Sequence, residues 1–170
     1  MKTPFKNSYW VIQNQLMAGE IPASIEPNET LEKLNALIKS GINVVINLME
    51  EDETNNSNEP FFDYASILVE NGIECLRYPI QDLSIPSEAL MHEILTKIEN
   101  CLINDKKVYV HCWGGVGRTG TVIGCFLKNN QLATNETVFQ MIDFLKKDSG
   151  IQHRNSPETL EQEEFVKHWS

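Results

Sequence analysis

The chain has 170 residues, a formal net charge of −10 at pH 7, 41% hydrophobic residues and 22% charged residues. A chain of this length and composition can bury a substantial core, and we expect residues 1–170 to form a single domain. The negative charge disfavours nucleic acid and anionic membranes as partners. Residues 1–15 contain no apolar signal-peptide core and no run has the length of a membrane span, so we expect a cytoplasmic location.

The first half of the chain alternates short apolar runs with amphipathic patterns. Residues 9–12 and 16–18 predict two strands joined in a hairpin. Helical spacing of apolar residues predicts a helix from Asn28 that ends at Gly41, and residues 42–48 predict a buried strand. Residues 50–59, called the acidic segment below, form either a solvated loop or an acidic rim that faces a substrate.

The second half continues this alternation and ends in helical patterns. Ser87 is the expected N-cap of a long helix, and Ser156 is the expected N-cap of the last helix, with Pro157 in its first turn. The other predicted elements are helices over residues 61–69, from Arg118 onward and over 136–147, and strands over 73–78 and 108–111.

Alternating strands and helices predict a three-layer α/β domain, in which a mostly parallel mixed sheet of about five strands is flanked by helices. In such sheets, ligands bind beyond the carboxyl ends of the strands. Cys112 follows one predicted strand and Asp82 follows another, so we expect the two side chains to face each other across one cleft.

The four cysteines, Cys75, Cys101, Cys112 and Cys125, show neither C-x-x-C pairing nor the spacing of zinc ligands. We therefore expect free thiols in a reducing compartment and no bound metal. Which of the other three thiols would form a protective disulfide with an oxidised Cys112 stays open.

Cys112 opens a glycine-rich loop between a predicted strand and a predicted helix. Such a loop directs backbone N–H groups and the positive end of the helix dipole into one cavity, which favours an oxyanion. Residues 115–120 also read G-x-G-x-x-G, the fingerprint of dinucleotide-binding proteins. That fingerprint requires an acidic residue at the end of the next strand, whereas Glu136 and Asp143 lie in or beside a helical pattern. The dinucleotide interpretation is therefore disfavoured.

The order His-Cys-x5-Arg-Thr-Gly at residues 111–120 resembles the phosphate-binding loop of the cysteine-dependent protein tyrosine phosphatases, and most closely their compact dual-specificity branch. The resemblance implies their fold, no cofactor, and Cys112 as a nucleophilic thiolate that forms a phosphocysteine. It also implies that His111 supports this thiolate and that Arg118 clamps two phosphoryl oxygens. Thr119 would donate to the sulfur when it leaves, or cap the helix. The expected phosphate-binding residues are Trp113, Gly114, Gly115, Val116, Gly117 and Arg118, with Trp113 either shaping the pocket wall or packing under the loop.

Two further residues take roles from the same resemblance. Asp82 lies in a proline-flanked loop thirty residues before Cys112, where the family places its general acid. Its alternative role is an Asx-type turn. Residues 158–162 are similar to a family loop of the form Q-T-x-x-Q, which makes Gln162 a candidate for positioning the hydrolytic water. Its alternative role is that of a surface helix residue.

The expected reaction is hydrolysis of phosphotyrosine in a phosphoprotein or phosphopeptide, with phosphoserine and phosphothreonine left open. The main alternative is a lipid or inositol-phosphate phosphatase, but no lysine lies between Cys112 and Arg118, which disfavours such substrates. A non-catalytic phosphate-binding scaffold would not need Cys112, Arg118 and Asp82 together. A redox enzyme or sulfurtransferase would not need this spacing of arginine and acid. The oligomeric state does not follow from the sequence.

Overall fold

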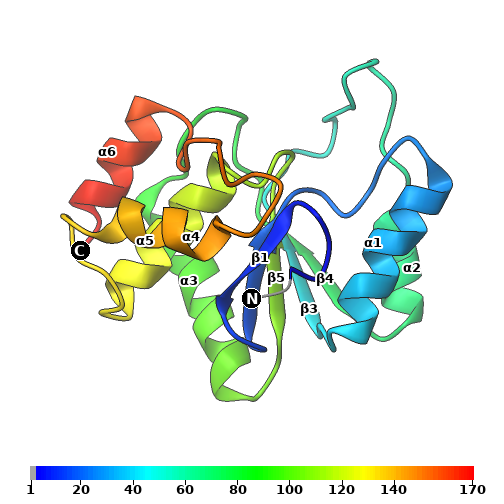
Figure 1. Cartoon of the computed structure of the whole chain (residues 1–170), viewed down its shortest axis with the longest axis horizontal. Helices are drawn as coiled ribbons and strands as arrows, with labels where there is room; N and C mark the ends of the chain where they lie inside the picture. The colour runs from blue at the N-terminus through cyan, green and yellow to red at the C-terminus, as the bar shows by residue number, and fades with distance from the viewer. Residues whose placement is uncertain (1–2) are drawn as a thin grey trace.

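The computed structural model describes residues 3–170, and a single five-stranded sheet forms its centre (Figure 1). The strands run in the order β1-β2-β5-β3-β4, with β1 and β2 antiparallel and the other pairs parallel. This mixed, mostly parallel sheet confirms the predicted fold class. The strands are β1 (Ser8–Ile12), β2 (Leu16–Gly19), β3 (Val44–Asn47), β4 (Glu74–Arg77) and β5 (Val108–His111).

Helices cover the sheet on both faces and complete three layers. In Figure 1, α1 and α2 lie on one side of the sheet and α3 to α6 lie on the other. The helices are α1 (Pro27–Lys39), α2 (Tyr64–Glu70), α3 (Glu88–Ile103), α4 (Arg118–Asn129), α5 (Val138–Lys146) and α6 (Leu160–His168). Within residues 3–170, no helix combines the length and the apolar character that a membrane crossing needs.

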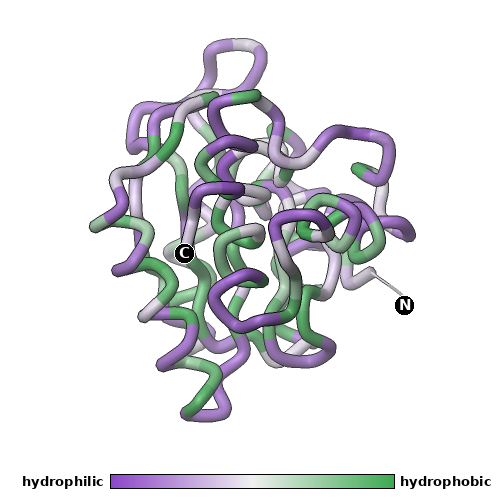
Figure 2. The backbone as a smooth tube through the Cα atoms, turned by 90° about the vertical axis from the view of Figure 1, so that its left-hand side faces the viewer, coloured by the Kyte–Doolittle hydropathy of each residue, from purple (hydrophilic) through white to green (hydrophobic). Residues whose placement is uncertain are grey.

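Strand β5 and helix α4 lie at the centre of the core. All four residues of β5 are buried, as are residues 118–127 of α4, whereas the loops that project furthest from the body are mainly hydrophilic (Figure 2). The polar end of the Tyr109 side chain in β5 has a partner inside the protein, because its hydroxyl donates to the Glu20 carbonyl. The loop between β5 and α4 is therefore held by two fully packed elements.

The predicted ends of the elements agree with the structure at most positions. Gly41 follows α1 with φ of 73°, and the Ser87 side chain caps α3 by accepting a hydrogen bond from the Leu90 amide at 3.1 Å. The left-handed backbone at Gly41 is one that glycine adopts without a side-chain clash.

The predicted start of the last helix is wrong. Helix α6 begins at Leu160, and its N-cap is Thr159, which forms a capping box with Gln162. Ser156 instead precedes a cis proline, and its hydroxyl donates to the Val116 carbonyl at 2.8 Å. The Ser156 hydroxyl is therefore engaged by the loop that contains Cys112, and a residue three positions later caps the helix.

Candidate active site

The carboxyl ends of three parallel strands lie in register at one edge of the sheet. Asn47 at the end of β3 pairs with His111 at the end of β5 and with Arg77 at the end of β4. The segments that leave these strands therefore emerge side by side. They enclose a cavity of about 570 Å³ lined by Glu50, Asp52, Glu53, Thr54, Asn56, Asp82, Leu83, Cys112, Trp113, Gly114, Gly117, Arg118, Arg154 and Glu158.

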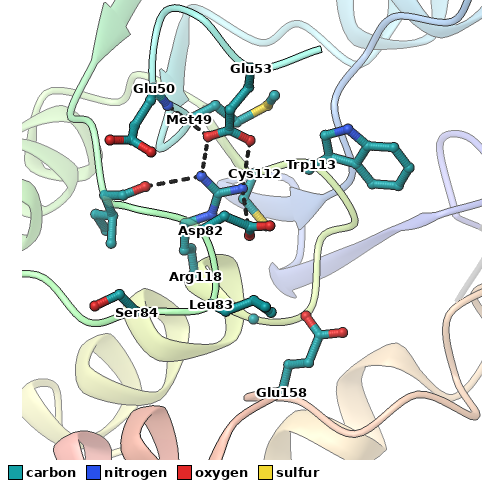
Figure 3. Close-up of polar contacts among 12 residues, drawn as sticks. Met49, Glu50, Glu53, Asp82, Leu83, Ser84, Cys112, Trp113, Arg118 and Glu158 are labelled. Atoms are coloured by element: carbon teal, nitrogen blue, oxygen red, sulfur yellow. Dashed lines mark hydrogen bonds and ion pairs between the residues drawn. The ribbon is translucent and has the colours of Figure 1, made fainter. Parts of the chain in front are cut away.

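Residues 112–117, the cysteine loop, contribute Cys112, Trp113, Gly114 and Gly117 to the lining of this cavity (Figure 3). Cys112 is 3% exposed, and α4 begins at Arg118 without a side-chain cap. Within residues 3–170, no hydrogen bond from the amides of residues 114–119 to a protein acceptor is present. Consecutive free amides at a helix N-terminus favour an anion, as the sequence predicted.

Gly115 allows the cysteine loop to pack against the segment that follows β2. Its φ is +74°, and a Cβ atom at this position would lie 2.4 Å from the Gly19 carbonyl carbon. The neighbouring Trp113 carbonyl accepts a hydrogen bond from the Ile21 amide at 3.2 Å. Val116 is buried, and its carbonyl accepts from the Gly120 amide as well as from Ser156. The shape of the loop is thus fixed by contacts on its outer side.

Arg118 is buried, with a side chain only 1% exposed, and it lies at the centre of a polar network. Its two terminal nitrogens engage both carboxylate oxygens of Glu53, at 2.9 Å for Nη2 to Oε2, and Nη1 also donates to the Ile80 carbonyl at 3.0 Å. Burial by itself would lower the pKa of Arg118, but the hydrogen bonds to Glu53, together with the electrostatic effects of Cys112, Glu53 and Asp82, outweigh it and raise the pKa. The side chain is a fixed cation.

Asp82 reaches Arg118 from the loop after β4. Its Oδ1 lies 3.0 Å from Nη2 of Arg118, and its side chain is 61% exposed. The structure thus brings Asp82, Cys112 and Arg118 to one cavity, as predicted. Within residues 3–170, its carboxylate accepts no hydrogen bond from a nearby amide, which argues against the Asx-type turn.

Glu53 was not predicted as a site residue. It belongs to the acidic segment, for which a substrate-facing rim was one of two interpretations, and Glu50, Asp52 and Glu53 do line the cavity. Trp113 fixes this segment, because its indole nitrogen donates to the Thr54 carbonyl at 3.1 Å and its ring meets Phe61 edge to face. Trp113 therefore lines the cavity and is bonded to the acidic segment, in agreement with the pocket-wall interpretation.

His111 lies behind Cys112 and is completely buried. Its Nε2 is 2.8 Å from the Tyr64 hydroxyl, and its Nδ1 is 3.2 Å from the Cys112 carbonyl oxygen. Burial and the positive charges of Arg77 and Arg118 lower the pKa of His111 to about 3, although the hydrogen bond to the Cys112 carbonyl opposes this. The imidazole is neutral at pH 7 and acts on Cys112 through the backbone.

Thr119 directly follows Arg118 and is completely buried. Its hydroxyl has no hydrogen-bond partner within the described residues, and neither does Nε of Arg118. Two buried donors without acceptors are rare in a folded protein. Arg118 lines the cavity, whereas Thr119 is not among the lining residues.

Gln162 is completely buried, which excludes the surface interpretation. Its Oε1 accepts from the amides of Glu158 and Thr159, and its Nε2 donates to the Ser84 carbonyl at 3.0 Å. Gln162 therefore connects α6 to the loop that contains Asp82. Its predicted role in positioning water stays a prediction.

Arg154 and Glu158 also line the cavity, and sequence reasoning did not single them out as site residues. They form an ion pair at 2.9 Å, and the Arg154 guanidinium lies above Gly114, where a Cβ atom would be 2.7 Å from Nη1. Buried Lys146 holds their loop in place by donating to the carbonyls of Gln152 and Arg154. No regular sequence pattern marks this loop.

The four cysteines are free, and Cys75, Cys101 and Cys125 lie away from the lining of the cavity. Burial raises the pKa of Cys75 to about 11 and also raises the pKa values of Cys101 and Cys125, so these three are neutral thiols at pH 7. In the part of the chain that the structure describes, no group of three or more acidic, histidine or cysteine side chains could hold a metal ion.

A family model described as "Polymorphic toxin system, DSP-PTPase phosphatase" matches residues 21–131, a range that includes Glu53, Asp82 and the cysteine loop. Among curated proteins, the chain is 31% identical over 158 residues to Protein tyrosine phosphatase domain-containing protein 1 of Mus musculus, covering 86% of this chain and 20% of that protein. It is 39% identical over 77 residues to Cyclin-dependent kinase inhibitor 3 of Sus scrofa, covering 44% and 34%. The matched regions thus span about a fifth to a third of these relatives.

Two solved structures share the fold over nearly the whole chain. Kinase associated phosphatase (KAP), with its catalytic cysteine replaced by serine, superposes with a TM-score of 0.75 at 18% identity, covering 98% of this chain and 93% of that chain. PTPMT1 in complex with PI(5)P superposes with a TM-score of 0.72 at 20% identity, covering 95% and 93%. At these identities, the likeness shows the fold alone.

Proposed function

Because the chain belongs to the DSP-PTPase family of phosphatases, we propose that it hydrolyses phosphotyrosine in a phosphoprotein or phosphopeptide through a phosphocysteine on Cys112. The proposal includes phosphoserine and phosphothreonine as further substrates of the same site. The single observation that supports it most is the 3.0 Å contact between Asp82 and Arg118 in the cavity that Cys112 also lines. This contact supports the proposal because it brings a carboxyl from the loop after β4 to the cavity that Cys112 and Arg118 line, where the proposed roles need it. The proposed location is the cytoplasm.

In the first step, the Cys112 thiolate attacks phosphorus, a sulfur–phosphorus bond forms, and the bond to the leaving oxygen breaks. The free amides of residues 114–119 and the guanidinium of Arg118 stabilise the charge on the phosphoryl oxygens. The phosphoryl oxygens accept hydrogen bonds from Nε and Nη2 of Arg118. These bonds replace the contact between Nη2 and Asp82. Once released from Arg118, the Asp82 carboxylate takes up a proton from solvent, and the neutral carboxyl then donates this proton to the leaving oxygen.

In the second step, water attacks the phosphocysteine, its proton passes to Asp82, and the sulfur leaves as a thiolate. The unpartnered Thr119 hydroxyl donates to that sulfur. His111 keeps the backbone of Cys112 in place throughout by its bond to the Cys112 carbonyl. These roles give partners to Nε of Arg118 and to the Thr119 hydroxyl, two of the buried polar groups without one within the described residues.

The first experiment measures hydrolysis of a small aryl phosphate in the presence of a metal chelator. We expect turnover by the wild type and a complete loss with Cys112→Ser. Full turnover by Cys112→Ser would refute the mechanism. The same assay, with phosphoinositide and inositol-phosphate substrates beside phosphopeptides, separates the proposed substrate class from the alternative one.

The second experiment tests Asp82 with a series of aryl phosphates whose leaving groups differ in basicity. Asp82→Asn removes the proton donor, so its kcat should fall most for the most basic leaving groups. Equal losses along the series would remove Asp82 from the acid role. Glu88→Gln, a change at an exposed carboxylate in the first turn of α3, is the control and should follow the wild type.

A further inference from the structure

Carboxylates outnumber cations around the catalytic cavity. The charged residues that line it are five acids, Glu50, Asp52, Glu53, Asp82 and Glu158, and two arginines, Arg118 and Arg154. A phosphate monoester adds roughly two further negative charges at neutral pH. Like charges within a partly enclosed cavity repel one another more strongly than charges on open surface.

Both arginines of the cavity are already paired. Arg118 is bound by Glu53 and Asp82, and Arg154 is bound by Glu158 at 2.9 Å. Glu50 and Asp52 have no cationic partner within residues 3–170. The Glu50 carboxylate lies beside the Glu53–Arg118 pair without a contact to it (Figure 3).

Arg77 is the third arginine at this edge of the sheet, and its hydrogen bonds go to the backbone of the segment after β3 rather than to a carboxylate. Its guanidinium donates to the backbone carbonyls of Met49 and Glu50, at 2.9 and 3.0 Å. No ion pair between Arg77 and a carboxylate is present in the described part of the chain. Glu50 and Asp52 thus line the cavity without an ion pair of their own in the described part of the chain.

One donor of Arg118 nevertheless stays open to an anionic ligand. Nε of Arg118 is buried and has no partner in the described residues, and Arg118 lines the cavity. A ligand that satisfies both this donor and the free carboxylates must carry a phosphate and a positive charge close to it. A phosphoinositide or polyphosphate supplies only the first of these.

We propose that the site prefers phosphopeptides in which lysine or arginine lies next to the phosphorylated residue, and that Glu50 and Asp52 bind this cationic side chain. This inference rests on the proposed function and names its substrate class. Glu50 and Asp52 lie in the segment after β3, on the rim of the cavity that holds Cys112. They act on specificity rather than on the chemical step.

The test compares two phosphotyrosine peptides of equal length that carry either arginine or glutamate on both sides of the phosphotyrosine. At low salt, the ratio of kcat/KM should favour the basic peptide by about threefold to tenfold, as expected for one or two partly exposed ion pairs. The ratio should fall toward one at 1 M salt, where the screening length is about 3 Å. A ratio of one at low salt, or a preference for the acidic peptide, would overturn the proposal.

The double variant Glu50→Gln/Asp52→Asn should bring the ratio close to one. Glu51→Gln is the matched control, because Glu51 is exposed, belongs to the same segment and does not line the cavity. An equal fall of the ratio in Glu51→Gln, or faster turnover of phosphoinositide vesicles than of the basic peptide, would contradict it. Turnover of the small aryl phosphate by the wild type tests the proposed function separately, since that substrate has no flanking residue.

Discussion

Tyr64 donates its hydroxyl proton to Nε2 of His111 across 2.8 Å. The direction follows from the other ring nitrogen, since Nδ1 faces the Cys112 carbonyl and a carbonyl can only accept. Nδ1 therefore carries the single proton of the neutral ring. The Cys112 carbonyl thus selects the tautomer of His111, and the hydroxyl of Tyr64 in α2, 47 positions earlier in the chain, donates to the remaining nitrogen.

Replacing Tyr64 by phenylalanine should lower the free energy of unfolding by about 1–3 kcal/mol, because a buried imidazole nitrogen then loses its donor. Tyr9→Phe is the matched control, since the Tyr9 hydroxyl is buried and has no partner within the described residues. That change should leave the stability unchanged or raise it. Urea unfolding of both variants measures the difference, and equal losses would show that the Tyr64–His111 bond contributes nothing.

His111 should make the protein less stable in acid. Its folded-state pKa is lowered to about 3, whereas an unfolded histidine titrates near pH 6.5. The unfolded chain therefore binds one more proton between these values, and this stabilisation, present above pH 6.5, is lost as the pH falls toward 3. The expected slope is about 1.4 kcal/mol per pH unit. The measurement is urea unfolding between pH 7 and 4, and His111→Asn should flatten the curve by this slope; parallel curves would contradict the assignment.

Glu53→Gln should reduce kcat/KM for a small aryl phosphate by about 100-fold, because a displaced guanidinium no longer meets the phosphoryl oxygens in the required geometry. The neutral amide cannot hold both terminal nitrogens of Arg118, which Glu53 now engages with two carboxylate oxygens. Glu51→Gln removes a charge two residues away and should retain the wild-type value. Steady-state kinetics of both variants decide the point: a wild-type kcat/KM in Glu53→Gln would mean that Ile80 and the backbone suffice to orient Arg118.

Gly115→Ala and Gly72→Ala separate backbone strain from steric overlap. Both glycines have positive φ, +74° and +77°, but a Cβ atom at Gly72 meets nothing within 4 Å, whereas at Gly115 it overlaps the Gly19 backbone. We expect Gly72→Ala to cost about 1–2 kcal/mol of stability, which is the strain alone. Gly115→Ala should cost clearly more and should also abolish activity, because the cysteine loop must move. Thermal unfolding and the aryl phosphate assay test this, and similar losses of stability in both variants would contradict it.

The sequence by itself determined the elements and the local chemistry of the cysteine loop. Strand and helix patterns are set by residues that are close in the sequence. Cys112 and Arg118 are also close in the sequence, because the loop between β5 and the start of α4 joins them. Asp82 was also predictable, since it follows a parallel strand whose carboxyl end must lie at the same edge of the sheet.

Only the tertiary structure decided which distant residues complete the site. Glu53 meets Arg118 across 65 positions, and Ser156 meets Val116 across 40, because β5 inserts between β2 and β3 and α6 packs on α4. Periodicity specifies which face of an element is buried, but it does not specify which element lies beside it. Ser156 was assigned to a helix cap for this reason, while its hydroxyl binds the cysteine loop. The local sequence thus encodes the cysteine loop and the start of α4, and long-range packing supplies the distant groups that contact them.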